Sequence, residues 1–199
     1  MNAPIRPPTL RERQKTATHA LILEAVGRCM QDRGLEELNF AEVAAEAGVG
    51  LRTVYRYFPT KDLLLDAFWS WLHASLGIDA FPETARELVA LPAKVFPMFD
   101  AQEAVIRGMM ASRQGRDVRM RVNDKRQAAI RKSVIDGAGE LPEPELSRVC
   151  AACQLLYSAT AWFTMKDYWG MSGEEAGKAA GEAIQALIDT AKAKRESQP

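Results

Sequence analysis

Two short apolar-patterned segments separated by one glycine constrain this chain more than any other feature. In "FAEVAAEAGVGLRTVYRYFPTKDLL", residues 40–64, Gly48 follows the first segment and Pro59 ends the second. Each segment spans about two helical turns, which is too short for a stable isolated helix. Glycine readily adopts the left-handed conformation that ends a helix, and proline cannot continue one. The pattern therefore predicts two short helices that are stabilised by packing.

The spacing of side chains around Gly48 gives the two predicted helices a common inner face. Asn39 is expected to cap the first helix, with Glu42 three residues further on. The residues expected to form the inner face are Val43, Ala47, Val49 and Val54, with the small Ala44 where the two helices approach closely. Such a pair is a helix-turn-helix, whose second helix leaves its outer face free for a DNA major groove.

The second helix, expected near residues 50–58, presents polar side chains outward when Val54 points inward. The residues left to face out are Arg52, Thr53, Tyr55 and Arg56. Arginine matches guanine edges bidentately, and threonine bonds a base or touches a thymine methyl group. Tyr57 and Lys61 lie where phosphates would pass, Lys61 at a helix N-terminus that attracts anions. An ordinary helical hairpin with solvated arginines is the alternative that we favour less.

Local charge supports an anionic partner more clearly than the whole-chain charge does. The chain has 26 Lys+Arg and 26 Asp+Glu residues, so its formal net charge of +0 is uninformative. The stretch from Gly48 to Lys61 holds basic residues and no acid, and residues 1–15 form a Pro-rich, basic arm that we expect to be disordered. The arm either reaches DNA or only improves solubility.

The remaining sequence predicts helices throughout. The first helix is expected from Thr18 to Gly34, and the fourth begins after the capping Thr60 with a buried stripe of Leu63, Leu64, Ala67, Phe68, Trp71 and Leu72. Further helices are expected near residues 83–96, 100–113, 117–136, 143–168 and 172–195. No segment alternates with strand period over a useful length. We therefore predict an all-α chain with an N-terminal three-helix helix-turn-helix domain and a C-terminal helical bundle.

The block "TVYRYFPTKDLL", residues 53–64, together with Gly34, Ala44 and the "AGV" turn, resembles the N-terminal DNA-binding domain of the TetR family of bacterial transcriptional regulators. The similarity covers roughly residues 15–75. It implies a DNA-binding domain over residues 16–75 and a ligand-binding and dimerisation domain over residues 76–199. It also implies a homodimer on a palindromic operator in double-stranded DNA, released by a small-molecule effector.

Two positions depart from the family pattern. Gly50 stands where the family commonly has a serine or threonine that caps the recognition helix and touches phosphate, and Arg52 stands where glycine is frequent. Both departures make the operator sequence hard to infer by analogy. Phosphate contacts are expected from Tyr57, Lys61, the basic arm and the start of the first helix near Thr18.

Methionine and aromatic side chains of the C-terminal half are candidates for an adaptable ligand pocket. They are Met98, Phe99, Met109, Met110, Tyr157, Trp162, Phe163 and Met165, and most are also suited to an ordinary core. Few acids interrupt this set, which favours an apolar or aromatic ligand. The basic run from Arg107 to Lys132 is expected to be a solvated face, with a site for an anionic ligand as the alternative.

The last two predicted helices carry the stripes expected to form a four-helix dimer interface. One stripe consists of Ala176, Ala180, Ala183, Ile184, Leu187 and Ile188, flanked by Gly177 and Gly181, and the other of Ala151, Ala152, Leu155, Leu156, Ala159 and Trp162. The alternative is that both stripes pack within one subunit. A lone recognition helix reads too few base pairs for a unique site, which favours the dimer.

The sequence thus predicts a DNA-binding regulator, as a repressor in the first place, and not an enzyme. Activation stays open, and a ligand carrier or enzyme that merely retains the bundle is the rival class. The two histidines, His19 and His73, are far apart, and Cys150 and Cys153 lie in an alanine-rich helix without redox-turn context, so no metal or cofactor is expected. No signal peptide or membrane-spanning stretch is recognised, and we expect a cytoplasmic protein.

Overall fold

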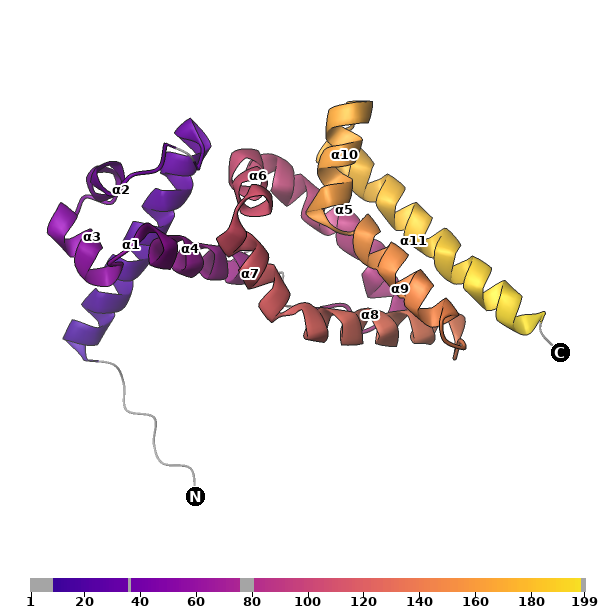
Figure 1. The fold of residues 1–199 in the computed structure, drawn as a ribbon. Coiled ribbons are helices and arrows are strands. Elements are labelled where there is room, and N and C mark those ends of the chain that lie inside the picture. Colours follow the sequence, from indigo (N-terminus) through magenta and orange to yellow (C-terminus); the bar gives the residue numbers. More distant parts are fainter. Residues whose placement is uncertain (1–8, 36, 76–80, 198–199) are drawn as a thin grey trace, which may run out of the picture. The chain divides into compact units, whose positions relative to one another are not determined.

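The structure, a computed structural model, describes residues 9–35, 37–75 and 81–197. These residues form eleven α-helices and no strand (Figure 1), which confirms the predicted all-α class. Contacts divide the chain into two compact units, Met1–Leu72 and His73–Pro199. Across the described ranges, no helix has both the length and the apolar character that a membrane span requires.

The first unit contains helices α1 (Leu10–Arg33), α2 (Phe40–Glu46), α3 (Leu51–Tyr57) and most of α4 (Lys61–Ser75). The expected start of the first helix at Thr18, after a disordered arm through residue 15, is wrong, because α1 already begins at Leu10. Thr9 and Glu12 form a capping box in which each side chain accepts a hydrogen bond from the other residue's backbone N–H. Residues 1–8 of the expected arm lie outside the described residues.

The predicted helix ends around the turn are confirmed. The side chain of Asn39 accepts a hydrogen bond from the Glu42 N–H across 3.0 Å at the start of α2. The hydroxyl of Thr60 accepts one from the Leu63 N–H across 3.2 Å at the start of α4. Gly34 follows α1 with a φ of 81° and Gly48 follows α2 with a φ of 65°, a left-handed region that favours glycine.

One part of the predicted stripe on α4 is wrong. Leu64, Phe68 and Leu72 are buried as expected, but Leu63 is 52% exposed. The adjacent residue Leu65 is buried instead. Helix α4 is apolar around most of its circumference here, so periodicity alone does not fix which leucine faces inward.

The second unit is a helical bundle. Its helices are α5 (Ala85–Ala101), α6 (Glu103–Ala111), α7 (Arg113–Arg121), α8 (Asn123–Ala138), α9 (Glu145–Leu156), α10 (Ala159–Trp169) and α11 (Gly173–Glu196). Helices α5, α8, α9 and α11 surround a common core. Leu88, Ile130, Cys153 and Ile184, one from each of these helices, are all fully buried there.

Three predicted helix boundaries in this unit are wrong. Helix α5 continues through Pro92 and Pro97, although we expected it to end near residue 96. The helices predicted at 117–136 and 143–168 are each interrupted, at Val122 and at Ser158. Ser158 caps α10 by accepting a hydrogen bond from the Ala161 N–H. Local propensity is weaker than tertiary packing at such positions, so these ends carry little sequence signal.

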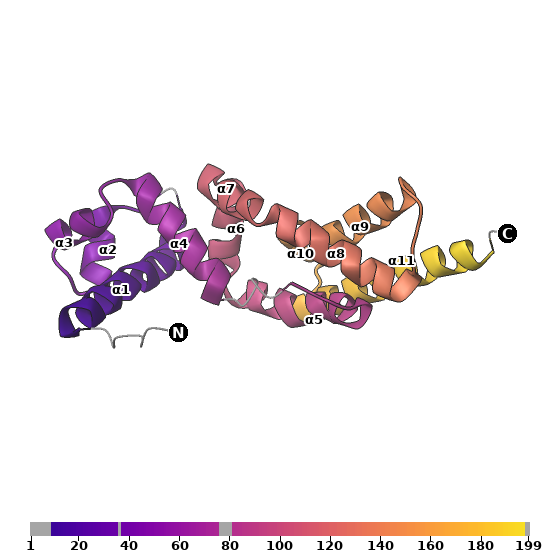
Figure 2. The same cartoon turned by 90° about the horizontal axis from the view of Figure 1, so that it is seen from below.

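The glycine-flanked stripe of α11 packs inside the subunit rather than forming a free surface. Helices α5 and α11 run side by side (Figure 1, Figure 2), and an added Cβ at Gly177 would lie 2.7 Å from the Cα of Ala93. At Gly181 it would lie 2.7 Å from the carbonyl oxygen of Val89. The expectation that these glycines offer a smooth surface to a second subunit is therefore wrong, because α5 already occupies that surface.

Candidate functional site

The turn between α2 and α3 is fixed by a glycine and by shared apolar packing. Gly48 has a φ of 65°, and the Val49 N–H donates to the carbonyl oxygen of Ala44 across 3.0 Å. Val43 and Val54 are both fully buried, on α2 and α3 respectively. Helix α3, only 7 residues long, is thus held by its inner face, which leaves the opposite face open.

The open face of α3 carries the side chains predicted to contact bases. Arg52 and Arg56 are exposed, and Thr53 is half-buried. Tyr55 is 51% exposed and rests against the ring of Phe40, with the ring centroids 4.7 Å apart. Tyr55 is therefore anchored on α2 while part of its ring remains accessible.

The N-terminus of α3 has no side-chain cap. Gly50 occupies the N-cap position in an extended conformation, with φ −69° and ψ 144°, and makes no side-chain hydrogen bond. The first amide groups of the helix are consequently not satisfied by a capping side chain. Such N–H groups are suited to an anionic oxygen.

The residues predicted to contact phosphate each make a hydrogen bond within the protein. The Tyr57 hydroxyl donates to the Lys15 carbonyl oxygen across 3.3 Å, which ties α3 to α1. Lys61 Nζ donates to the Leu35 carbonyl oxygen across 3.4 Å. The Thr18 hydroxyl donates to a carbonyl one turn earlier in α1. A phosphate contact by any of the three requires that it share or exchange this bond.

An open groove runs between α1 and the end of α3. It is lined by Arg11, Gln14, Lys15, Ala17, Thr18, His19, Leu21, Arg56 and Tyr57, a set with three basic side chains and no carboxylate. His19 was not predicted to lie in this groove; its ring centroid is 5.1 Å from that of Phe58. Burial, reinforced by Lys15, lowers the pKa of His19. The positive charge of the groove therefore comes from its arginines and lysine.

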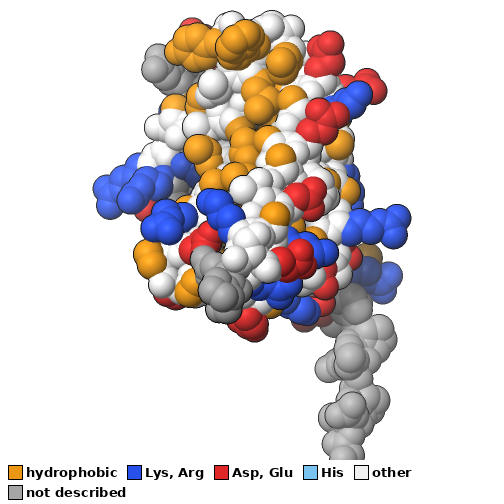
Figure 3. Space-filling view, turned by 90° about the vertical axis from the view of Figure 1, so that its right-hand side faces the viewer, with side chains coloured by type: hydrophobic (Ala, Val, Ile, Leu, Met, Phe, Trp, Pro, Cys, Tyr) orange, Lys and Arg blue, Asp and Glu red, His pale blue; other side chains and the backbone are white. Residues whose placement is uncertain are grey.

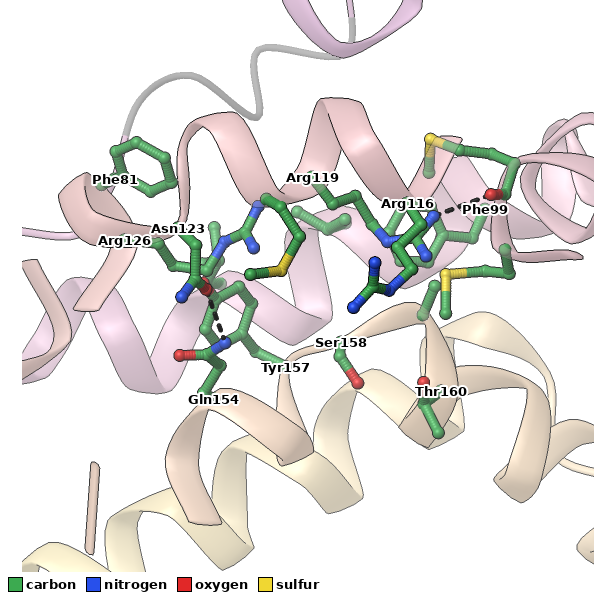
Figure 4. Close-up of a pocket in the computed structure, with 16 residues that line it drawn as sticks. Phe81, Phe99, Arg116, Arg119, Asn123, Arg126, Gln154, Tyr157, Ser158 and Thr160 are labelled. Carbon is green, nitrogen blue, oxygen red and sulfur yellow. Dashed lines mark hydrogen bonds between the residues drawn. The ribbon is translucent and has the colours of Figure 1, made fainter. Parts of the chain in front are cut away.

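The second unit contains a cavity of about 340 Å³ between α5, α6, α7, α8 and the junction of α9 with α10 (Figure 4). Its apolar wall consists of Phe81, Leu91, Val95, Phe99, Met109, Met110, Met120 and Ala159. Its polar wall consists of Arg116, Arg119, Asn123, Arg126, Gln154, Tyr157, Ser158 and Thr160. A cavity of this size and composition suits a small ligand.

The eight residues predicted to bind ligand fall into two groups. Phe99, Met109, Met110 and Tyr157 line the cavity, whereas Met98, Trp162, Phe163 and Met165 are not among the lining residues. Trp162 is fully buried and donates its indole N–H to Asp100. The rings of Trp162 and Phe163 both lie beside the guanidinium of Arg107, at 5.6 and 5.9 Å. These two aromatic side chains contribute to packing around Arg107 instead of to the cavity wall.

The polar half of the cavity was not predicted residue by residue. Arg116, Arg119 and Arg126 belong to the basic run that we expected to be a solvated face. Their spacing of three and seven residues would have placed them on one side of a continuous helix. The rest of the run is mixed, because Arg131 and Lys132 pair with Glu143 and Glu83.

The helix-turn-helix unit is similar to known DNA-binding proteins. Residues 22–68, which include the turn and all of α3, match the model of bacterial regulatory proteins of the tetR family. An uncharacterised HTH-type transcriptional regulator from Haemophilus influenzae is 39% identical over 74 residues, which cover 35% of this chain and 39% of that protein. Residues 22–68 thus form a DNA-binding domain of the TetR type.

Solved structures extend the likeness to the fold of the second unit. A TetR-family regulator from Streptomyces coelicolor matches with a TM-score of 0.70 and 18% identity over 89% of this chain and 86% of that one. A TetR regulator from Rhodococcus sp. RHA1 matches with a TM-score of 0.51 and 25% identity over 87% and 98%. The helical C-terminal region is thus arranged as in TetR structures. The family consists of transcriptional regulators, not enzymes.

The cysteine pair of the second unit is buried and reduced. Cys150 and Cys153 are free thiols on α9. Burial raises the pKa of Cys153 to about 12, so its thiol is protonated near neutral pH. Within the described ranges, no cluster of three or more His, Cys, Asp or Glu side chains is placed to hold a metal ion.

Proposed function

We propose that this protein is a dimeric, ligand-responsive transcriptional repressor that places α3 of each subunit in successive major grooves of a palindromic operator. The observation that carries the proposal is the exposed basic face of α3, opposite the buried Val54. Arg52, Thr53, Tyr55 and Arg56 would read base edges from that face.

The groove beside α3 supports a path for the DNA backbone. Arg11, Lys15 and Arg56 line it without an opposing carboxylate, and the uncapped N-terminus of α3 adds free amide groups. Tyr57, Lys61 and Thr18 would provide further phosphate contacts. These contacts supply affinity that falls steeply with salt and does not depend on base sequence.

The test is fluorescence anisotropy on a labelled fragment from upstream of the protein's own gene, against scrambled DNA and over a salt series. Arg52→Ala and Arg56→Ala should each weaken binding to the cognate site by about 1–3 kcal/mol. Each should also reduce the preference for one base at a single operator position. Arg148→Ala, an exposed arginine of the second unit, is the matched control. Failure to bind any DNA at low salt would exclude the function. A promoter–reporter fusion, with lower expression in the presence of the protein, tests repression against activation.

Exposed apolar side chains on α9 and α10, the segment expected to form one side of the dimer interface, support dimerisation. Tyr168 and Trp169 are 81% and 76% exposed, and Leu155 at the end of α9 is 56% exposed. Figure 3 shows hydrophobic side chains gathered at the top of this face and continuing down it. Exposed apolar patches of this kind mark protein interfaces. Leu155→Glu and Trp169→Glu should give monomers by light scattering, with helical content unchanged and operator affinity lost.

The cavity of the second unit supports an effector with an apolar body. Phe99, Met109 and Met110 line it, and methionine side chains adapt to varied shapes. Ligand binding would favour a spacing of the two α3 helices that no longer fits successive grooves. Release of the labelled fragment on addition of a ligand measures this step directly.

A further inference from the structure

Three arginines enter the cavity wall without a carboxylate to balance them. Arg116 and Arg119 extend from α7 and Arg126 from α8 into the space facing the junction of α9 and α10 (Figure 4). No aspartate or glutamate is among the lining residues. None of the three arginines forms an ion pair with a carboxylate in the part of the chain that the structure describes. By contrast, Arg107 and Arg131 of the same unit are each paired with acids.

The arginines also act on one another across the cavity. Arg119 is half-buried, and its Nη1 donates to the Met109 carbonyl oxygen across 2.7 Å, which satisfies only one of its donors. Burial lowers the pKa of Arg119, and the positive charges of Arg126 and Arg116 lower it further. The cavity therefore concentrates positive charge that no carboxylate among the described residues balances.

A buried hydroxyl without a partner lies beside this charge. Tyr157 is only 9% exposed, and its hydroxyl has no hydrogen-bond partner in the described structure. Burial raises the pKa of Tyr157 to about 12, against the opposing effect of Arg126, so the hydroxyl remains a donor. Buried polar groups are almost always satisfied, so an unpartnered donor in a cavity wall indicates an acceptor that belongs there.

The N-terminus of α10 adds to the same wall. Ser158, the N-cap, and the first two residues of this 11-residue helix, Ala159 and Thr160, all line the cavity. A helix N-terminus carries partial positive charge and free N–H groups, both of which favour an anion. Three arginines, a tyrosine hydroxyl and a helix N-terminus are therefore gathered around one space.

We propose that the cavity binds an amphipathic anion, in which an oxyanion head meets Arg116, Arg126 and the Tyr157 hydroxyl while an apolar body packs on the Phe99 and Met109 side. The inference rests on the proposed function, because it names the chemical class of the same effector. The sequence favoured an apolar or aromatic ligand and left an anionic ligand open for the basic run from Arg107 to Lys132. The proposed ligand combines the two, with an apolar body and one negatively charged end. The head is a carboxylate or a phosphate, which share the geometry that arginine recognises.

Isothermal titration with four probes that share one alkyl chain tests the inference. They are decanoate, decyl phosphate, decan-1-ol and decylamine. At least one of the two anions should bind about tenfold more tightly than the alcohol, since a hydrogen bond to a charged group is stronger than a neutral one. Decylamine should bind most weakly. The tighter of the two anions identifies the head group. Binding of the alcohol as tight as both anions, or no binding of either anion, would overturn the proposal.

Matched variants locate the binding. Arg116→Gln and Arg126→Gln should each weaken binding of the preferred anion about tenfold and leave binding of the alcohol unchanged. Arg113→Gln is the control, because Arg113 is on α7 but its side chain is 89% exposed and does not line the cavity. Arg119 is not substituted in this test, because its side chain also donates a hydrogen bond to the Met109 carbonyl oxygen. Equal losses in all three variants, or none, would contradict the proposed site. Thermal melts without ligand check that each variant folds.

Operator release is measured separately so that the two proposals can fail independently. If the protein binds DNA but neither anion, the proposed regulatory function stands and the proposed ligand class is excluded. Anion binding that leaves the DNA complex intact would support the ligand class and exclude induction by it. If the protein binds an anion but no DNA, only the proposed regulatory function is contradicted.

Discussion

Trp162 donates its indole N–H to the carboxylate of Asp100 across 2.9 Å, and this bond joins α10 to the end of α5. The same carboxylate accepts bonds from Lys166 Nζ, at 3.1 Å, and from the Gly173 N–H at the start of α11. One aspartate therefore holds three helices next to the cavity. The sequence placed Trp162 in the ligand pocket, whereas the structure uses it in this cluster.

Asp100→Asn should destabilise the second unit by about 2 kcal/mol at pH 7, because the amide presents a donor to groups that themselves donate. Burial alone would raise the pKa of Asp100, but the bonds from Gly173, Trp162 and Lys166 hold it below its ordinary value of 3.8. The stabilisation is thus fully present above that value and is lost as the pH falls through the lower, folded-state pKa.

Urea unfolding of wild type and Asp100→Asn from pH 7 to pH 3 measures this difference. The difference between the two stabilities should shrink as the pH falls below 3.8, where the unfolded chain takes up the proton, and should vanish below the lower, folded-state pKa. Glu140→Gln, at an exposed carboxylate, should change stability little at any pH. A difference that persists unchanged to pH 3 would mean that the charge of Asp100 contributes nothing.

Gly48→Ala should lower the stability of the helix-turn-helix, and Gly50→Ser should raise it. No atom lies within 4 Å of an added Cβ at Gly48, so the cost is the left-handed conformation itself, about 1–2 kcal/mol. Gly50 is extended and open, so serine there can cap α3 and gain a few tenths of a kcal/mol. Hydrogen exchange of α2 and α3 amides reports both effects. Operator affinity should fall for the first variant.

Gly181→Ala should destabilise the second unit by about 1–3 kcal/mol through overpacking, although alanine is the better helix former. The reason is the Val89 carbonyl oxygen, 2.7 Å from the added Cβ. Glu182→Ala, at the exposed neighbouring position, should be neutral or slightly stabilising. An unchanged melting temperature for Gly181→Ala would restore Gly181 to the subunit surface, where the sequence first placed it.

Alkylation of native protein at pH 8 should modify Cys29 well before Cys150 or Cys153. Burial raises the pKa of all three thiols, but Cys29 is the only one of them that is not buried. Peptide mass spectrometry after brief treatment with iodoacetamide measures the order. Rapid labelling of the pair on α9, or a disulfide between them under mild oxidation, would show that this segment opens in the native state.

The helix-turn-helix could be predicted closely because each of its signals is local. Asn39 caps the following helix, Gly48 ends it, and Pro59 limits the next. Such signals act through backbone geometry within a few residues, so they do not depend on the rest of the fold. With the apolar Val54 placed inward, helical spacing then predicted that Arg52 and Arg56 face outward.

Tertiary structure decided the rest. Helix α5 continues through Pro92 and Pro97, and α10 starts after Ser158, which was not predicted to cap a helix. Packing in the bundle outweighs weak local preferences at these positions. Which arginine meets an acid depends on partners far along the chain: Arg107 reaches Asp167, whereas Arg116, Arg119 and Arg126 meet an open cavity. The sequence by itself determined a helix-turn-helix on an all-α chain. Only the fold decided which charges are balanced by a carboxylate and which line a cavity without one among the described residues, because long side chains find their partners through space rather than through sequence order.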